Sequence, residues 1–265
     1  MTTTPVEQVA ARLDDAVRSA TAIPQPSAGE DSLTLPLAYE VQRAGLALRS
    51  GRGDTTIGVK LGFTSKAKAA QMGVSDVIIG AITSSMEVVD GGEIDLSALI
   101  HPRIEPEVAF LLGEDVDPHD PRSVARTAVS HVAPALEIID SRYRDFAFSL
   151  EDVVADNTSA AGFVTGPWTS FAEGRVDLDN RGVILEQDGE PVMTGSTSAI
   201  LGHPEHALSA AKRMARLYGH GLPAGTILLA GAATPAVPLV PGSRVEATVS
   251  GLGRVGVTAT GASHG

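Results

Sequence analysis

The sequence contains no cysteine, and aromatic residues make up only 4% of its 265 residues. Without cysteine the chain can form no disulfide, thiolate nucleophile, iron–sulfur cluster or cysteine zinc site, so its chemistry must use oxygen and nitrogen groups. Basic residues are also scarce, since 20 Lys and Arg face 32 Asp and Glu and leave a formal net charge of −12. That charge repels phosphate backbones and argues against nucleic acid as a partner. An anionic substrate would therefore need local positive charge from a lysine, an arginine or a metal.

Long hydrophobic runs are missing as well. No apolar stretch approaches the roughly 18 residues of a membrane span, and the N-terminus has neither the basic nor the apolar region of a secretory signal. We therefore expect a cytoplasmic protein with no membrane partner. The common motifs of nucleotide-binding proteins, zinc proteases and serine hydrolases are absent too, so these classes of function find no support.

The N-terminal part of the chain has the spacing of helices. Val9, Leu13 and Val17 repeat at helical intervals after a capping box with proline at the first helical position, and a second periodic stretch covers residues 37–48. The glycines of SGRGD end the second stretch. The sequence therefore predicts two helices before residue 55.

From residue 55 onward the pattern is that of strands. Short runs rich in Val, Ile, Leu and Thr alternate with Gly, Pro and Asp turns, and the last of them, residues 246–258, predicts a hairpin. Helical patterns interrupt this region near residues 121–131 and 204–218. We therefore expect an α+β protein with a helical N-terminal segment, residues 1–54, and a β-rich catalytic domain, residues 55–265.

The stretch IEPEVAF places two glutamates in a run that is otherwise apolar and strand-like. Side chains alternate across a strand, so Glu105 and Glu107 point to one face while Ile104 and Val108 point to the other. The two negative charges then lie close together. One interpretation is an exposed strand face, which Pro106 favours because proline cannot donate to a strand ladder and prefers edge strands. The other is that a positive charge lies between the carboxylates.

A third glutamate lies in the apolar run PALEIID. Glu137 has apolar neighbours on both sides, and because an unpaired buried carboxylate is costly, it should have a partner. The partner could be Arg142 or Arg103 in a structural ion pair. Alternatively, three glutamates without cysteine form an all-oxygen site of the kind that Mg²⁺ or Mn²⁺ prefers. Such a cation would also explain the first two glutamates.

A lysine in the run TTIGVKLGFTS is the candidate for acid–base chemistry. Val59 and Leu61 point to one face of this strand, and Gly58, Lys60 and Gly62 to the other. Glycines flanking the lysine often let a ligand approach the backbone. The ordinary alternative is a lysine that points to solvent from an edge strand. Beside a metal, Lys60 would act as an acid or base or bind a carboxylate.

Several long blocks resemble, in order and spacing, the 2-keto-4-pentenoate hydratase and 2-oxo-3-hexenedioate (4-oxalocrotonate) decarboxylase family of the fumarylacetoacetate hydrolase superfamily. They are GVKLGFTSKAKAAQMGV, HPRIEPEVAF, PALEIIDSRYRDF, VVADNTSAAGFV, SAILGHP and LPAGTILLAGAAT. The resemblance implies a mixed β-roll with a helical N-terminal segment, usually as a homo-oligomer. It also implies that Glu105, Glu107 and Glu137 bind Mg²⁺ or Mn²⁺ and that Lys60 is the family's strand lysine.

The two branches of this family catalyse different reactions on nearly the same site. SKAKAAQMGV, IHPRIEPEVAF, SAILGHP and AGAAT look like the decarboxylase branch, whereas hydratases tend to show LQPRVEAE and SGALG. Hydratases also commonly carry an acidic residue where this chain has Ile78. The resemblance therefore implies decarboxylation of 2-oxo-3-hexenedioate to 2-hydroxy-2,4-pentadienoate in meta-cleavage aromatic catabolism, with the hydratase reaction as the alternative.

The chemistry of that substrate suggests roles for further residues. Its C6 carboxylate belongs to a vinylogous β-keto acid, so its loss as CO2 needs an electron sink, which a metal at the 2-oxo acid end supplies. Lys60 would neutralise or protonate the oxyanion side. If Ile78 and Ile79 face the leaving carboxylate, they would promote its loss by desolvation. The residues expected to line the substrate pocket are Gly62, Arg142, Ser159 and Ser198.

Three other interpretations are open. A C–C bond hydrolase of the fumarylacetoacetate type needs a histidine–acid dyad, and no histidine precedes Lys60. A non-enzymatic scaffold subunit would have lost a metal glutamate or the lysine, and all four are present. The fold could also serve another 2-oxo acid in a different pathway. The expected partners are a small 2-oxo dicarboxylic acid, further copies of the chain, and a paralogous hydratase.

Overall fold

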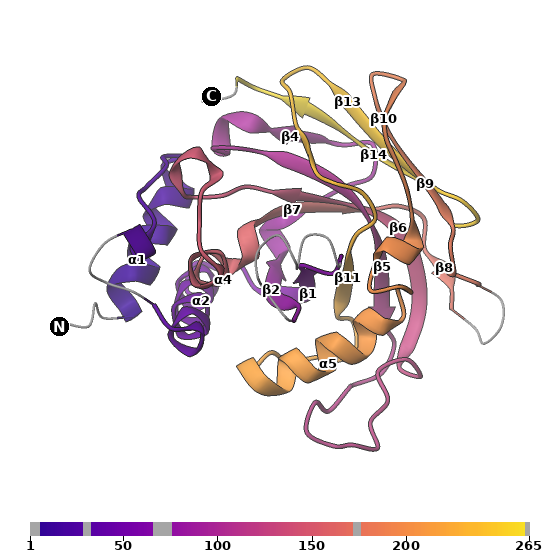
Figure 1. Cartoon of the computed structure of the whole chain (residues 1–265), viewed down its shortest axis with the longest axis horizontal. Coiled ribbons are helices and arrows are strands. Elements are labelled where there is room, and N and C mark those ends of the chain that lie inside the picture. Colours follow the sequence, from indigo (N-terminus) through magenta and orange to yellow (C-terminus); the bar gives the residue numbers. More distant parts are fainter. Residues whose placement is uncertain (1–5, 29–32, 66–75, 172–175, 263–265) are drawn as a thin grey trace.

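The computed structural model describes residues 6–28, 33–65, 76–171 and 176–262. Within these residues the chain forms a nine-stranded mixed sheet, a five-stranded sheet and four α-helices (Figure 1). The helices are α1 (Val6–Arg18), α2 (Leu35–Ser50), α4 (Leu150–Ala155) and α5 (His206–Tyr218). No helix of this described part is long and apolar enough to cross a membrane.

The larger sheet has the order β2-β1-β11-β5-β6-β7-β3, with β12 paired to β5 and β8 to β6. It curves so strongly that it wraps around an interior, with β7 above and β11, β1 and β2 below (Figure 1). Its strands are β1 (Thr56–Gly62), β2 (Ile78–Thr83), β3 (Glu87–Val88), β5 (Arg103–Leu112), β6 (Val129–Ile139), β7 (Ala160–Thr165), β8 (Thr169–Ser170), β11 (Ile227–Ala232) and β12 (Val237–Pro238).

The smaller sheet, of order β10-β9-β13-β14-β4, covers part of the outer face of the larger one. Ile104 of β5 and Leu136 of β6 pack there against Leu185, Val245 and Val255, all of them buried. This packing fixes which side of β5 and β6 faces outward, so the alternate residues must face the interior. The strands are β4 (Glu93–Asp95), β9 (Gly182–Gln187), β10 (Glu190–Ser196), β13 (Arg244–Val249) and β14 (Gly253–Thr260).

The predicted fold class is confirmed, and so are the first two helices and the final hairpin, which is β13 and β14. The helix predicted from residue 204 is also confirmed as α5, and it ends at Gly219, which takes the left-handed φ of 79°. The helix α4 was not predicted, although Ser149 and Asp152 form a capping box at its start.

The helix predicted at residues 121–131 is wrong. Turns and irregular backbone occupy this segment up to residue 128, and β6 begins at Val129. The carboxylate of Asp120 accepts a hydrogen bond from the backbone of Arg122, and such a side-chain bond competes with helix formation. Lys212 of α5 also donates to the carbonyl oxygen of Asp120, 2.7 Å away, which holds the turns in place.

Side chains satisfy the outer backbone edge of β2, the last strand on one side of the larger sheet. The amide of Ile79 donates to the hydroxyl of Tyr39 at 3.3 Å, and its carbonyl accepts from Gln42 Nε2 at 3.1 Å. Asn157 bonds both backbone groups of Ala81, at 2.9 and 2.8 Å. The helix α2 is therefore bound directly to the sheet, and the division of the chain at residue 54 stays a prediction.

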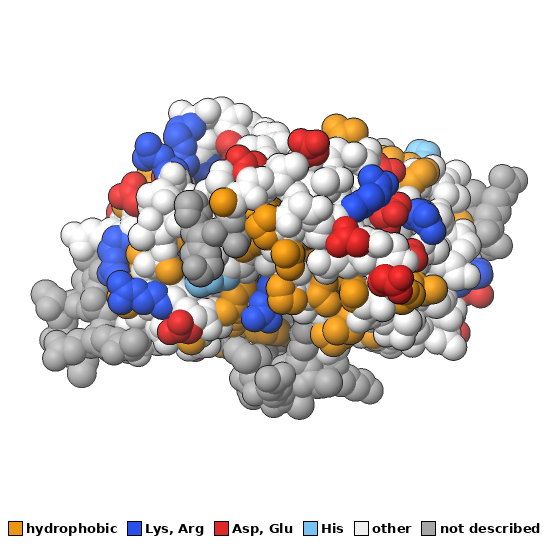
Figure 2. Space-filling model, turned by 90° about the horizontal axis from the view of Figure 1, so that it is seen from above, with side chains coloured by type: hydrophobic (Ala, Val, Ile, Leu, Met, Phe, Trp, Pro, Cys, Tyr) orange, Lys and Arg blue, Asp and Glu red, His pale blue; other side chains and the backbone are white. Residues whose placement is uncertain are grey.

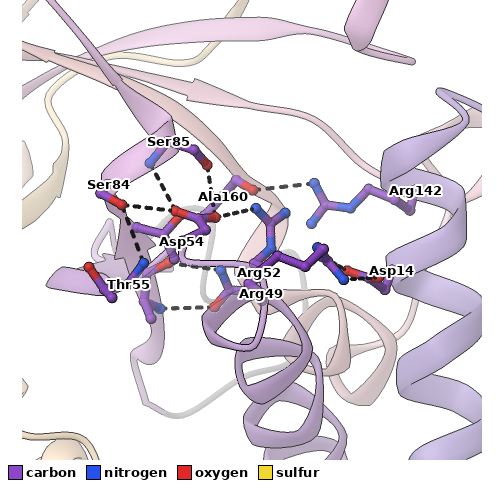
Figure 3. Close-up of polar contacts among 12 residues, drawn as sticks. Asp14, Arg49, Arg52, Asp54, Thr55, Ser84, Ser85, Arg142 and Ala160 are labelled. Carbon is purple, nitrogen blue, oxygen red and sulfur yellow. Dashed lines mark hydrogen bonds and ion pairs between the residues drawn. The ribbon is translucent and has the colours of Figure 1, made fainter.

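Asp54 joins the end of α2 to the end of β2 (Figure 3). Its carboxylate accepts hydrogen bonds from Arg49, from the hydroxyls of Thr83 and Ser84, and from both the hydroxyl and the backbone amide of Ser85. Burial alone would raise the pKa of Asp54, but these donors outweigh it and lower the pKa below its usual value.

We expect Asp54→Ala to lower the free energy of unfolding by about 2 kcal/mol at neutral pH, because several charge-assisted hydrogen bonds are lost. A carboxyl with a lowered native pKa stabilises the fold above its unfolded pKa, and this contribution is lost as the pH falls through the native pKa. The difference between the variant and the wild type should therefore shrink below about pH 4. Urea unfolding at neutral pH and below about pH 4 measures this difference in stability, and the exposed Glu190→Ala is the control. An equal difference at both pH values would contradict the assignment.

The molecular surface mixes charges of both signs with exposed hydrophobic side chains. Figure 2 shows hydrophobic side chains in the middle of one face and acidic and basic side chains close to them. On the smaller sheet, Arg254 lies 3.7 Å from Glu186 and 3.8 Å from Glu246. Because exposed ion pairs contribute little, about 0–1 kcal/mol each, the fold depends on its core and not on these pairs.

Candidate metal centre

Three glutamates meet on the inner face of the larger sheet. Glu105 of β5 stands opposite Glu137 of β6 in the ladder, and Glu107 follows two residues along β5. All three are at least 95% buried, and each offers a carboxylate oxygen within 4.8 Å of the others. The exposed strand face that Pro106 favoured is therefore wrong, because β5 lies in the middle of the sheet. The three side chains form a set of oxygen donors that could hold a metal ion.

The carboxylates repel one another in this buried place. Burial raises the pKa of Glu107 well above its usual value, and the charges of Glu137 and Glu105 raise it further. Burial also raises the pKa of Glu137, although Lys60 opposes that shift. A divalent cation held among these oxygens would relieve the repulsion between the carboxylates. Oxygen-only donors of this kind suit Mg²⁺ or Mn²⁺.

Lys60 is a positively charged partner of this cluster inside the protein. It lies on β1 between β2 and β11, is 3% exposed, and its Nζ lies 3.0 Å from Glu137 Oε1. Burial would lower the pKa of Lys60, but the charges of Glu137, Glu105 and Glu107 outweigh burial and raise it. The expected alternative of a solvent-exposed lysine is therefore wrong. The alternative ion pair of Glu137 with Arg142 or Arg103 is also wrong, because Glu137 pairs with Lys60.

The glycines beside Lys60 make room for neighbouring protein groups. A Cβ on Gly62 would lie 2.8 Å from the side chain of Ile78, and one on Gly58 would lie 2.9 Å from Ile82. Ile78 therefore shares the face of Lys60, while Ile79, the next residue of the strand, points to the opposite face. The two isoleucines therefore cannot both face the leaving carboxylate of a substrate. The expectation that they desolvate it can apply only to Ile78.

A glycine at an irregular point of β11 orients Glu107. The backbone amide of Gly231 donates to Glu107 Oε2 at 2.7 Å, while Glu107 Oε1 has no hydrogen-bond partner. Gly231 has a φ of 113°, and a Cβ there would lie 2.1 Å from the hydroxyl oxygen of Thr64. Only glycine fits this position, so one oxygen of Glu107 is fixed and the other is left for a metal.

We expect Gly231→Ala to lower the affinity for Mg²⁺ or Mn²⁺ by about 10–100-fold, because a group that orients a metal ligand is displaced. Calorimetric titration with Mn²⁺ measures the effect. Gly189→Ala is the matched control, since Gly189 also has a positive φ, of 84°, but a Cβ there would meet nothing within 4 Å. Unchanged affinity in Gly231→Ala, with native stability, would show that Glu107 needs no such support.

The structure places the other predicted site residues in different surroundings. Ser159 is buried within the turn that contacts Lys60, and its hydroxyl has no partner. Arg142 is buried in an ion pair with Asp156, and the hydroxyl of Ser198 lies 3.0 Å from that of Ser196. Lys60 and the three glutamates are thus brought together, whereas the recorded contacts of Arg142 and Ser198 are with other groups.

Some residues of the site were not predicted from the sequence. Thr158 accepts a hydrogen bond from Lys60 Nζ at its carbonyl oxygen, 3.2 Å away, and Asn157 holds the same turn against β2. The signal for this turn was weak, although asparagine tolerates left-handed φ better than most residues. Most of the stretch SKAKAAQMGV, which looked like the decarboxylase branch, lies outside the described residues.

A strongly curved mixed sheet thus buries three glutamates and a lysine on its inner face, an arrangement that could hold a metal ion. The sequence model of the fumarylacetoacetate (FAA) hydrolase C-terminal family matches residues 55–259. The chain therefore belongs to this family, as the sequence resemblance predicted.

The chain is similar to individual members over nearly its whole length. It is 49% identical to a 4-oxalocrotonate decarboxylase from Pseudomonas sp. over 256 residues, which cover 97% of this chain and 98% of the relative. It is 33% identical to 2-hydroxyhexa-2,4-dienoate hydratase from Comamonas testosteroni, over 96% of this chain and 97% of the relative. The solved 4-oxalocrotonate decarboxylase from Pseudomonas putida G7, complexed with magnesium and adipate, superposes with a TM-score of 0.89 at 35% identity, covering 96% of this chain and 97% of that one.

Proposed function

We propose that this chain is a metal-dependent carboxy-lyase that converts 2-oxo-3-hexenedioate (4-oxalocrotonate) to 2-hydroxy-2,4-pentadienoate and CO2. The observation that carries the proposal is the buried set of Glu105, Glu107, Glu137 and Lys60 on one sheet face. The similarity to 4-oxalocrotonate decarboxylases supports it, since these relatives match nearly the whole chain.

Glu105, Glu107 and Glu137 would hold the metal, which we propose to be Mg²⁺ or Mn²⁺. Glu107 Oε1 and Glu137 Oε2 have no hydrogen-bond partner, as expected of atoms kept for a cation, while Glu137 Oε1 makes the ion pair with Lys60. When bound, the cation supplies a Lewis acid that polarises the ketone of a 2-oxo acid. The solved relative from Pseudomonas putida G7 contains magnesium, in line with this choice.

The protein's own groups would manage charge and water around the substrate. Lys60 Nζ holds a proton beside the carboxylates and would neutralise the oxyanion that develops at the 2-oxo end. Phe163, Leu229 and Ala109 form a buried apolar surface on the same inner face, and this surface would keep water from the leaving carboxylate. Among the predicted pocket residues, Gly62 and Ser159 lie beside Lys60 or its turn, and we retain Arg142 and Ser198 as candidates.

Hydration is the second candidate reaction, because a hydratase is similar to this chain over nearly all of both sequences. Ile78 argues against hydration. It lies on the same sheet face as Lys60, and its apolar side chain offers no acid or base to activate water.

Turnover of 2-oxo-3-hexenedioate and of 2-hydroxy-2,4-pentadienoate with Mg²⁺ separates the two reactions. CO2 release from the first compound and persistence of the second would support the decarboxylase. Consumption of the dienol without CO2 release would show a hydratase.

The predicted assembly and location remain proposals. We propose a homo-oligomer in the cytoplasm, with a paralogous hydratase as a further protein partner that receives the dienol product. We also keep the proposed division into a helical segment, residues 1–54, and a catalytic domain, residues 55–265. Size-exclusion chromatography with light scattering, alone and with the hydratase, tests the assembly.

A further inference from the structure

The turn between α4 and β7 is strained. Asn157, Thr158 and Ser159 have φ values of 48°, 53° and 59°, so three consecutive residues with side chains are left-handed. This conformation is uncommon outside glycine and costs of order 1 kcal/mol or more per residue, so surrounding contacts must hold it.

Two features of β2 hold this turn in place. The side-chain amide of Asn157 bonds both the N–H and the carbonyl of Ala81, as described above. The preceding residue, Gly80, leaves space for the turn, because a Cβ there would lie 2.2 Å from Thr158 Oγ1. Gly80 stands opposite Lys60 in the ladder between β1 and β2, so the turn lies on the same sheet face as the lysine.

The strained turn makes direct contact with the site. The carbonyl oxygen of Thr158 accepts a hydrogen bond from Lys60 Nζ at 3.2 Å, and the same ammonium group lies 3.0 Å from Glu137 Oε1. The hydroxyls of Thr158 and Ser159 are buried without partners, although buried hydroxyls are normally satisfied. Unpaired polar groups and three strained residues lower the stability of the fold. Their presence in this turn therefore points to a role in the site.

We propose that Asn157 is a positioning residue: its two bonds to β2 hold the turn so that the Thr158 carbonyl fixes the ammonium group of Lys60. Asn157 itself acts on no substrate atom. The inference rests on the proposed function, because it assigns Asn157 to the orientation of the proposed catalytic lysine. The three glutamates lie on β5 and β6 and not on the turn, so a variant of the turn leaves the proposed metal ligands in place.

Two variants disturb the turn in different ways. Asn157→Gly removes both bonds to Ala81 while tolerating the left-handed φ, and Gly80→Ala forces Thr158 away from β2. Gln42→Met is the matched control, because it removes one side-chain bond to Ile79 of the same edge strand and one to Val154 of α4, and neither bond involves residues 157–159. For each purified, folded variant, kcat, KM, Mn²⁺ affinity and thermal stability are measured.

Both turn variants should lose about tenfold to a hundredfold in kcat while Mn²⁺ affinity changes less than about twofold, because a catalytic group is misplaced and the metal ligands are not. Gln42→Met should lose stability but keep its kcat. If kcat per folded molecule is unchanged in Asn157→Gly, or falls as much in Gln42→Met, the proposal is overturned.

A crystal structure of Asn157→Gly tests the inference independently of any activity measurement. Lys60 Nζ should leave the Thr158 carbonyl, and a turn and lysine in their original positions would overturn the proposal. If the wild-type protein released no CO2 from 2-oxo-3-hexenedioate, the proposed function would fail, and this structural result would still test the role of Asn157.

Discussion

Glu107→Gln should abolish metal-dependent turnover, with a loss of about 10³-fold or more in kcat/KM. The substitution removes a negative charge from the set of three buried carboxylates while keeping an oxygen that can accept from the Gly231 amide. A bound metal contributes several kcal/mol to such reactions, and each 1.4 kcal/mol corresponds to tenfold in rate. The loss should therefore come from the metal and not from the fold.

Thermal unfolding with and without Mn²⁺ separates these causes. A ligand at 100 times its dissociation constant stabilises the native state by about 2.7 kcal/mol, so the wild type should gain stability with Mn²⁺ and Glu107→Gln should not. Without metal, the variant should be at least as stable as the wild type, because one of three repelling carboxyls has been neutralised. The exposed Glu114→Gln is the control. An unaltered Mn²⁺ effect in Glu107→Gln would remove this residue from the metal site.

Lys60→Met should lower kcat by about 10²–10³-fold while Mn²⁺ affinity is kept or increased. The ammonium group lies 3.0 Å from Glu137 Oε1, so a divalent cation competes with it for the same carboxylate. Its loss removes the charge that would neutralise the oxyanion, which is typically worth that factor in rate. Methionine keeps most of the buried volume.

Mn²⁺ titration followed by single-turnover kinetics tests this prediction. Lys212→Met is the control, since Lys212 lies on α5 and bonds the turns near Asp120. If Lys60→Met bound Mn²⁺ more than tenfold more weakly, Lys60 would be a support for the metal site. If it retained wild-type kcat, the lysine would have no part in the chemistry.

The local pattern was sufficient to predict the shared face of Glu105 and Glu107 and the burial of Glu137. Alternation along β5 gave a common face for Glu105 and Glu107, and the apolar neighbours of Glu137 predicted that it is buried and has a partner. Which partner it has could not be predicted. Lys60 reaches Glu137 only because β11 lies between β1 and β5, and that strand order depends on pairings between distant parts of the chain.

Pro106 was misleading for a related reason. Proline usually marks an edge strand, but here it lies in a central one, where its carbonyl accepts from the amide of Ala233 and the register between β11 and β5 is interrupted next to it. The interruption is the same irregular stretch that contains Gly231. A single sequence gives the rule for proline but not the neighbouring irregularity that allows an exception.

The capped edge of β2 has a consequence for the behaviour of the chain in solution. An end strand with free N–H and C=O groups is a template on which another molecule can add a strand, and this is a common route to aggregation. Tyr39 and Gln42 form hydrogen bonds with the backbone N–H and C=O of Ile79. A protein shortened to residues 55–265 would therefore expose these two backbone groups. The helical segment thus protects the edge of the sheet from strand addition. Without it, the β-rich part should precipitate or form oligomers through pairing of β2.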